Sequence, residues 1–386
     1  MFRAVLLLLA LLAALPAQAS ETVICRVCAN TGMLPCKAHG KAMLEKEHSV
    51  HFCSAAMECK ICGGTLQVDC KSCRNEKSEA ELAKLQKRMQ DWRADRKLKV
   101  DDVAKGLPLM HLQTAHFELA YGIKPQPVGR EKFETHPAMH LYGERLETLR
   151  TEFMKLLGAE DGELNGRLQV FMSRDQLGQQ NLAPIVTQGL GGGKAVGVKS
   201  MGVLSVYCMW QEPTTLPDDE ALHRNIIHNT THLLLCNLAP SLHLYDKHVG
   251  WIDEGFSHWF EDKLTGKCTN FCYEEVLMQG AASFKGGRWR APVRRMVDEG
   301  KLTSFAALAQ KNTDELDFPQ HAQSFALIDW LLTVHGGPKF KTFIGMIKAG
   351  KATRDALQAV YNTTPIAIDT EFSTWVKANY SPQEPR

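Results

Sequence analysis

The alternation of apolar and polar residues predicts strands in the first half of the long C-terminal region and helices in its second half. Strand patterns occur at MHLQTAHFELAYG (110–122), RLQVFMS (167–173) and KAVGVKSMGVLSVYCMW (194–210), the last as one or two strands. Helical patterns cover 139–158, about 218–237, about 250–263 and several stretches beyond 270. Strands followed by helices predict an α+β fold, with a sheet that ends in an antiparallel edge strand and a helical C-terminal part.

A charged stretch precedes this region. Residues 75–105 are rich in Lys, Arg, Asp and Glu, and apolar residues recur among them at helical spacing. These apolar positions are Leu82, Leu85, Met89 and Trp92. We therefore expect an exposed helical linker at 77–105, which joins a small domain at 20–76 to a large domain at 106–386.

The first nineteen residues have the three parts of a secretory signal peptide. Arg3 supplies the positive charge, residues 4–15 form a short apolar run, and residues 17–19 (AQA) form a small-x-small cleavage site. The apolar run is about 12 residues long, against roughly 20 for a membrane span. We expect cleavage after Ala19, no span in the mature protein, and a secreted or periplasmic location.

Charge and composition exclude one class of partner. The 386-residue chain is 44% apolar and carries a formal net charge of +2, and its basic residues are spread along the chain. Near-neutral charge and predicted export both disfavour a nucleic-acid partner. The apolar content is ordinary for globular domains.

Eight of the twelve cysteines lie between residues 25 and 73, and their spacing repeats. The pattern is C-x2-C-x7-C-x2-[H/C], with each position of the second copy 34 residues after its counterpart in the first. The predicted ligands are Cys25, Cys28, Cys36 and His39, then Cys59, Cys62, Cys70 and Cys73. C-x2-C pairs point two sulfurs at one ion, so the repeat predicts two structural zinc sites. Disulfide bonds are the alternative that export favours, but a histidine in the repeat cannot join one.

This stretch resembles the cysteine-rich zinc domain of DnaJ-type chaperones, from which it departs in its weaker glycine pattern and in His39. The resemblance implies nested sites, in which the first pair shares an ion with the fourth and the second with the third. Pairing within each repeat fits the spacing equally well. Cys53 is left over.

HNTTH at 228–232 places two histidines on one face of a predicted helix, and Glu254 opens the next helical pattern within WIDEGFSHWFED (251–262). Two histidines and a later glutamate form the three-ligand zinc site of a hydrolase, which leaves a fourth position for water. His258 is expected to support a ligand or to pack. The alternative is that all of these are ordinary surface residues.

The HxxxH and W-x-x-E-G motifs resemble those of the gluzincin, or thermolysin-like, metallopeptidases, and the helical tail at 321–380 is similar to that of bacterial proteins of this group. The resemblance implies that His228, His232 and Glu254 bind zinc and that an extended peptide lies along the edge strand near 195–210. It also implies a glutamate general base at position 229, where this chain has Asn229. Asparagine cannot accept the proton, and loss of a general base typically costs about 10²–10⁴-fold in rate.

Three functions follow from these motifs. The first is an exported zinc protein with an impaired peptidase-like domain that binds polypeptides, and with three zinc ions. The second is an active metallopeptidase with an unusual base. The third is a chaperone-like binding module without enzymatic activity.

The remaining HxxxH motif and the last four cysteines are not predicted to bind metal. HPAMH (136–140) repeats the HxxxH spacing, but no glutamate follows it suitably, so His136 and His140 are expected at the surface or in a helix cap. Cys208, Cys236, Cys268 and Cys272 are expected as disulfides or as buried thiols.

Overall fold

The structure is a computed structural model of the chain. It describes residues 25–37, 52–54, 59–65, 67–73, 76–96, 107, 109–189, 195–201, 205–238, 248–272 and 286–383. The predicted signal peptide and His39 lie outside these ranges. Within them, no helix is long and apolar enough to cross a membrane.

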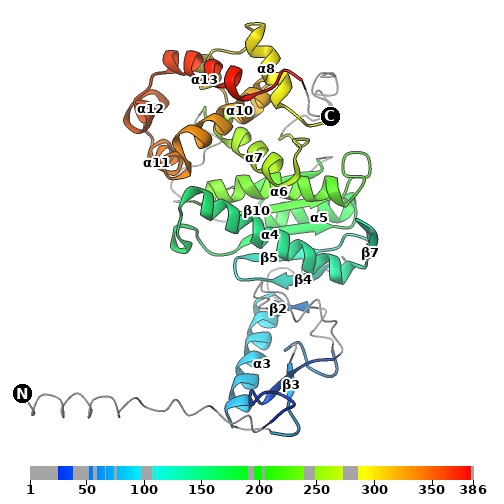
Figure 1. The fold of residues 1–386 in the computed structure, drawn as a ribbon. Coiled ribbons are helices and arrows are strands. Elements are labelled where there is room, and N and C mark those ends of the chain that lie inside the picture. Colours follow the sequence, from blue (N-terminus) through cyan, green and yellow to red (C-terminus); the bar gives the residue numbers. More distant parts are fainter. Residues whose placement is uncertain are drawn as a thin grey trace, which may run out of the picture.

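A six-stranded sheet forms the middle of the molecule (Figure 1). In spatial order its strands are β2 (Phe52–Cys53), β4 (Met110–Gln113), β5 (Phe117–Tyr121), β8 (Leu168–Ser173), β10 (Val206–Trp210) and β9 (Gly197–Ser200). β8 pairs in parallel with β5 and with β10, whereas β2–β4, β4–β5 and β9–β10 are antiparallel. The sheet is therefore mixed, with an antiparallel strand at each edge.

Two of the predicted strand patterns each form a pair of strands. The pattern at 110–122 divides into β4 and β5 because Thr114 and Phe117 close a tight turn between them, with the N–H of Thr114 donating to the carbonyl of Phe117 at 2.9 Å. The pattern at 194–210 divides into β9 and β10. The sequence did not predict the hairpin of β6 (Gln126–Val128) and β7 (Glu131–Phe133), or helix α5 (Gln176–Val186).

Helices cover both faces of the sheet. Helix α4 (Thr135–Leu157) packs on β4 and β5, and α5 packs on β8 and β10. Successive side chains of β5 point to opposite faces of the sheet. Leu119 and Tyr121 lie in the core beneath α4, and Ala120 lies in the apolar cluster beneath α5. Both clusters are apolar, and their burial stabilises this layered arrangement.

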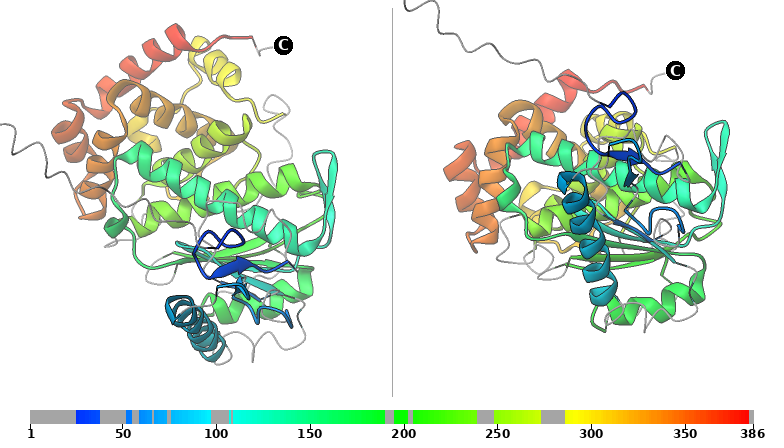
Figure 2. Two further views of the ribbon diagram at one scale, coloured as in Figure 1. Left: turned by 60° about the horizontal axis from the view of Figure 1, so that its bottom comes forward. Right: turned by 90° about the horizontal axis from the view of Figure 1, so that it is seen from below.

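The C-terminal part is helical, and its helices gather on one side of the sheet (Figures 1 and 2). Helix α7 (Gly250–Thr265) packs between α6 (Asp219–Asn237) and α10 (Phe318–His335). A Cβ at Gly255 would lie 2.6 Å from the carbonyl oxygen of Ser324, so glycine is what allows α7 to approach α10 this closely. The surrounding elements are α8 (Arg290–Asp298), α9 (Phe305–Leu308), α11 (Gly337–Lys348), α12 (Thr353–Tyr361), α13 (Pro365–Asn379) and the 3-10 turns Asp161–Glu163 and Thr313–Glu315.

The cysteine-rich segment lies at the other end of the molecule in Figure 1. Strands β1 (Met33–Pro35) and β3 (Gln67–Asp69) pair antiparallel, and α3 (Glu76–Arg96) follows them as the predicted charged helix. Strand β2, although it lies within the cysteine-rich part of the sequence, pairs with β4 of the large sheet. The α+β class is confirmed, and the domain limits stay predictions.

Candidate metal centre

Two histidines on α6 bring their Nε2 atoms together. His228 and His232 are four residues apart and share one face of the helix, and their Nε2 atoms lie 3.2 Å apart. The helix begins at a well-formed N-cap, where the carboxylate of Asp218 accepts a hydrogen bond from the backbone N–H of Ala221. Both imidazoles are fully buried, and they converge on a point between α6 and α7.

Glu254 reaches this point from α7. Its Oε1 lies 3.4 Å from Nε2 of His232, and its Oε2 lies 3.5 Å from Nε2 of His228. The carboxylate is fully buried, and neither oxygen accepts a hydrogen bond from the described residues. Burial opposes ionisation, but the neighbouring His232 and His228 hold the pKa of Glu254 well below its usual range. A buried carboxylate without hydrogen-bond donors needs a cation beside it.

Cys272, which the sequence did not assign to this site, completes it. Its Sγ lies 3.5 Å from Nε2 of His228 and 3.3 Å from Nε2 of His232. Of the two predictions for Cys272, the disulfide is wrong and the buried thiol is confirmed: its sulfur is free and buried, and the nearby Cys268 donates its thiol to the carbonyl of His258 at 3.3 Å. No motif along the chain connects Cys272 to HNTTH.

The four side chains have the dimensions of a tetrahedral zinc site. With bonds of about 2.0–2.1 Å to nitrogen or oxygen and 2.3 Å to sulfur, a tetrahedron has N···N and N···O edges of roughly 3.3–3.4 Å and S···N edges of roughly 3.5 Å. The distance between the two histidine nitrogens is 3.2 Å, those from Cys272 to the histidines are 3.3 and 3.5 Å, and those from the histidines to the nearer oxygens of Glu254 are 3.4 and 3.5 Å. The residues therefore fit a zinc ion held by four protein ligands.

Charge supports the same conclusion. Three buried carboxylates surround the site, those of Asp253, Glu254 and Glu261, and the ammonium of the partly buried Lys199 touches Cys272. Burial opposes protonation of the imidazoles, but without a metal ion these acidic neighbours raise the pKa of His228 and of His232. Imidazoles bind a metal in their neutral form, and in that form the buried carboxylates outnumber the single ammonium. A divalent cation would balance this excess of negative charge.

A second layer of side chains supports the ligands. Oδ1 of Asp253 lies 2.7 Å from Nδ1 of His232. His258 and His321, on α7 and α10, lie 3.3 and 3.5 Å from Oε2 of Glu254. His258, which the sequence placed next to a ligand, thus contacts Glu254.

Glu261 holds the segment that delivers Cys272. Its Oε1 accepts hydrogen bonds from the backbone N–H of Thr269 at 2.6 Å and from the side-chain amide of Asn270 at 2.9 Å. Although burial opposes ionisation, the neighbouring imidazoles of His228 and His258 lower the pKa of Glu261 to about 2. This carboxylate therefore ties α7 to residues 269–270, two positions before the thiol.

Asn229 stands beside the site and is not a ligand. Its amide nitrogen donates to the carbonyl of Asn225 at 3.0 Å, and its Oδ1 accepts from Nζ of Lys199 at 3.1 Å. Burial would lower the pKa of Lys199, but Cys272 and Glu254 raise it above its ordinary value. Lys199 therefore stays protonated and can donate a proton but not accept one.

The eight-position repeat forms nested groups. Cys25 and Cys28 lie with Cys70 and Cys73, and Cys36 lies with Cys59 and Cys62. The Sγ atoms of Cys25 and Cys70 are 3.8 Å apart, as are those of Cys36 and Cys59, whereas those of Cys28 and Cys73 are closer, at 3.0 Å. A tetrahedral zinc site has S···S edges of roughly 3.8 Å, whereas a disulfide bond is about 2.05 Å long. No disulfide links any of the twelve cysteines.

Two further cysteines are buried thiols in the large domain. Cys208 lies in the apolar cluster beneath α5, and burial raises its pKa to about 12. Burial likewise raises the pKa of Cys236 to about 11. Both groups stay protonated at neutral pH.

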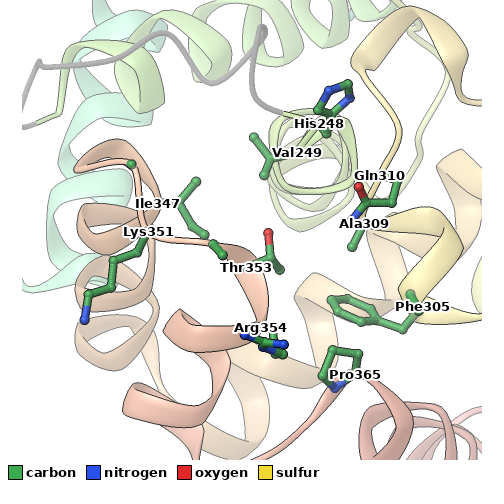
Figure 3. Close-up of a pocket in the computed structure, with 13 residues that line it drawn as sticks. His248, Val249, Phe305, Ala309, Gln310, Ile347, Lys351, Thr353, Arg354 and Pro365 are labelled. Atoms are coloured by element: carbon green, nitrogen blue, oxygen red, sulfur yellow. The ribbon is translucent and has the colours of Figure 1, made fainter.

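A cavity of about 430 Å³ lies elsewhere, beside the start of α7, α9 and the α11–α12 connection (Figure 3). His248, Phe305, Lys351, Thr353 and Arg354 are among its lining residues. None of the side chains that line it belongs to the His228 group. The candidate metal centre is thus a packed site between helices and not part of this cavity.

No protein-family profile matches the sequence, and no curated protein matches it. Among solved structures, the chain is similar to a two-domain M1 zinc metallopeptidase, determined as a glutamate-to-alanine mutant bound to L-arginine. The TM-score is 0.31 and the identity 15%, over 70% of this chain and 50% of the other. The chain thus spans half the length of that protein. A similarity of this size carries no argument about activity, which rests on the side chains described above.

Proposed function

We propose that this protein is an exported zinc-binding protein whose gluzincin-like domain retains zinc as a structural centre and does not hydrolyse peptides. The position of Cys272 carries this proposal, since its sulfur lies 3.3 and 3.5 Å from the two histidine nitrogens. Structural zinc sites are closed by four protein ligands, whereas catalytic sites keep one position open.

Two features of the chain remove the chemistry that such an ion supplies. Bound zinc polarises a carbonyl and acidifies a water, and both actions need an open coordination position. In this chain Cys272 is placed to fill that position. Asn229 stands where the gluzincin resemblance implies a glutamate, and its amide accepts a hydrogen bond from Lys199 and cannot take up a proton.

Peptidase assays on four full-length chains test the proposal. The chains are wild type, Asn229→Glu, Cys272→Ala and the double variant. We expect no hydrolysis of a quenched peptide library by wild type or by either single variant, because each single variant keeps one of the two defects. The double variant should exceed both by roughly 10²-fold or more, the usual contribution of a general base.

The number of zinc ions per chain distinguishes a folded but inactive protein from a misfolded one. Wild type should lose one zinc ion per chain on His228→Ala, and Asn229→Glu should keep it, because Asn229 is not among the ligands. Hydrolysis by wild type that is abolished by His232→Ala would overturn the proposal in favour of an active enzyme with an unusual base.

Polypeptide binding is the second part of the proposal, and the position of the partly buried strand β9 at one edge of the sheet favours it. The N–H of Trp210 donates to the carbonyl of Val196, so Val196, Val198 and Ser200 are the residues that bond to β10. The intervening Gly197 and Lys199 direct their backbone N–H and C=O groups outward. An extended peptide could pair with these groups as an added strand.

A matched pair of variants tests this edge. Lys199→Pro and Lys199→Ala both remove the ammonium, but only proline removes the outward N–H, at an edge position where proline is tolerated. We expect Lys199→Ala to bind a fluorescent unfolded polypeptide several-fold more tightly than Lys199→Pro. Equal affinities would exclude β9 as the binding edge.

Export is the third part, and the signal-peptide pattern at residues 1–19 supports it. N-terminal sequencing of the protein recovered from its host should begin at Ser20. An uncleaved N-terminus in the cytoplasmic fraction would contradict export.

A further inference from the structure

Cys53, His136 and His140 form another group of metal-binding atoms, which shares no residue with the His228 site. Sγ of Cys53 lies 3.4 Å from Nε2 of His136 and 3.4 Å from Nε2 of His140. The two Nε2 atoms lie 3.2 Å apart. Cys53 belongs to β2, and both histidines lie in the first two turns of α4.

The structure corrects the sequence prediction for His140, whereas His136 is partly exposed in the first turn of α4. His136 and His140 were expected at the surface or in a helix cap, and Cys53 was left without a role. His140 is instead buried, with 6% of its surface exposed, and Cys53 is 1% exposed. Cys53, the third member of the group, precedes the HxxxH motif by more than 80 positions. A search for a ligand after the motif could not find it.

The geometry is that of one face of a tetrahedral metal site. Zinc with two imidazole ligands and one thiolate ligand has N···N edges of roughly 3.3 Å and S···N edges of roughly 3.5 Å, close to the 3.2 and 3.4 Å observed. Hydrogen bonds explain the triangle less well. Each imidazole nitrogen carries either one N–H or one lone pair, which points at a single hydrogen-bond partner. Here each Nε2 atom instead faces two atoms, the sulfur and the other nitrogen.

A nucleophilic role for Cys53 is disfavoured by its surroundings. A Cys–His pair needs a thiolate that a substrate can reach, and the thiol of Cys53 is buried under α4. His136 is partly exposed, so solvent reaches one member of the group. A metal ion bound there could take a water or another side chain as its fourth ligand.

We propose that Cys53, His136 and His140 bind a further zinc ion, which clamps the cysteine-rich segment to the large sheet. Strand β2 has two residues, paired with Leu112 and Gln113 of β4, and so short a strand is weakly held by its own hydrogen bonds. A metal ion shared by Cys53 and α4 would anchor it to a long helix that packs on β4 and β5. This site is independent of whether the large domain hydrolyses peptides.

Zinc content of the full-length mature protein tests the site. We expect His136→Gln to hold one zinc ion fewer per chain than wild type and His136→Cys, which replaces one ligand by another, to keep the wild-type count. His116→Gln is the matched control, because His116 is partly exposed, pairs with Glu147 and belongs to neither the Cys53 group nor the His228 group. An unchanged count in His136→Gln would overturn the proposal.

Alkylation of the native protein provides the second readout. Metal-bound thiolates react slowly, so Cys53 should gain iodoacetamide reactivity at least several-fold in His136→Gln, as located by fragmentation of the tryptic peptide 47–60. Cys59, on the same peptide, should stay protected by its own zinc site, and Cys208 should stay unreactive if the variant is folded. Equal reactivity of Cys53 in wild type and variant would show that the three side chains are a hydrogen-bonded cluster only.

Discussion

Oδ1 of Asp253 lies 2.7 Å from Nδ1 of His232, and this contact determines which imidazole nitrogen faces the candidate metal centre. The other carboxylate oxygen of Asp253 accepts a hydrogen bond from the hydroxyl of Thr313 at 3.3 Å. The carboxylate is therefore held from two sides, and Nε2 of His232 is directed toward Glu254 and Cys272. Carboxylates in this position orient a histidine ligand and raise its basicity.

Asp253→Asn should weaken zinc binding at this centre by about 10–100-fold, the usual effect of losing such a partner. Competition with a chromophoric chelator measures the affinity. Asp262→Asn is the control, because Asp262 is on the same helix but pairs with Arg290. An equal loss of affinity in both variants would indicate a general effect on α7.

The nested arrangement of the cysteine-rich segment predicts which thiols respond together. Cys25→Ser should release one zinc ion and make its partners Cys28, Cys70 and Cys73 reactive to iodoacetamide, while Cys36, Cys59 and Cys62 stay protected. Mass spectrometry of the alkylated peptides measures this. Reactivity of Cys36 in place of Cys70 would indicate pairing within each repeat.

Gly255→Ala should destabilise the protein by about 1–3 kcal/mol, because the added Cβ would lie 2.6 Å from the backbone oxygen of Ser324 on α10. Gly345→Ala is the matched control in helix α11, where a Cβ meets nothing within 4 Å. That change should stabilise by roughly 0.5–1 kcal/mol, since alanine is the better helix former. Denaturant unfolding measures both, and similar effects at the two positions would contradict close packing of α7 against α10.

His223 should make the folded state less stable in acid. Burial, and then the charge of Arg145, lower its pKa from 6.5 to about 4. The unfolded chain therefore takes up a proton between about pH 6.5 and 4 that the folded chain does not, so stability is present at neutral pH and falls as the pH drops through this range. His223→Gln removes this contribution.

When the pH is lowered from 7 to 4.5, the free energy of unfolding should fall by about 2 kcal/mol more in wild type than in His223→Gln. Urea unfolding at the two pH values measures the shift. Zinc loss in acid affects both chains alike and cancels in the comparison. A difference that does not change with pH would show that His223 titrates normally in the folded protein.

Periodicity along the chain predicted the elements that carry the candidate site. The pattern at 218–237 corresponds to α6 and the pattern at 250–263 to α7. These predictions depend on residues a few positions apart, whose side chains share a face whenever the helix forms. The hairpin β6–β7 and helix α5 were not predicted. Turn and cap contacts help to form them, and the sequence pattern did not reveal these contacts. At the start of α5, for example, the carboxylate of Asp175 accepts a hydrogen bond from the N–H of Gly178.

The sequence by itself determined the local relationships: the i, i+4 spacing of His228 and His232, the adjacency of Glu254 to a helix start, the C-x2-C pairs, and the asparagine at position 229. Such relationships are set by 3.6 residues per turn or by a tight loop, and tertiary contacts do not change them. Only the tertiary structure decided that Cys272 joins His228, that Cys25 lies with Cys70, and that Cys53 meets His140. Each of these joins residues more than 40 positions apart, and their contact depends on how whole helices and strands pack, which no spacing rule along the chain specifies.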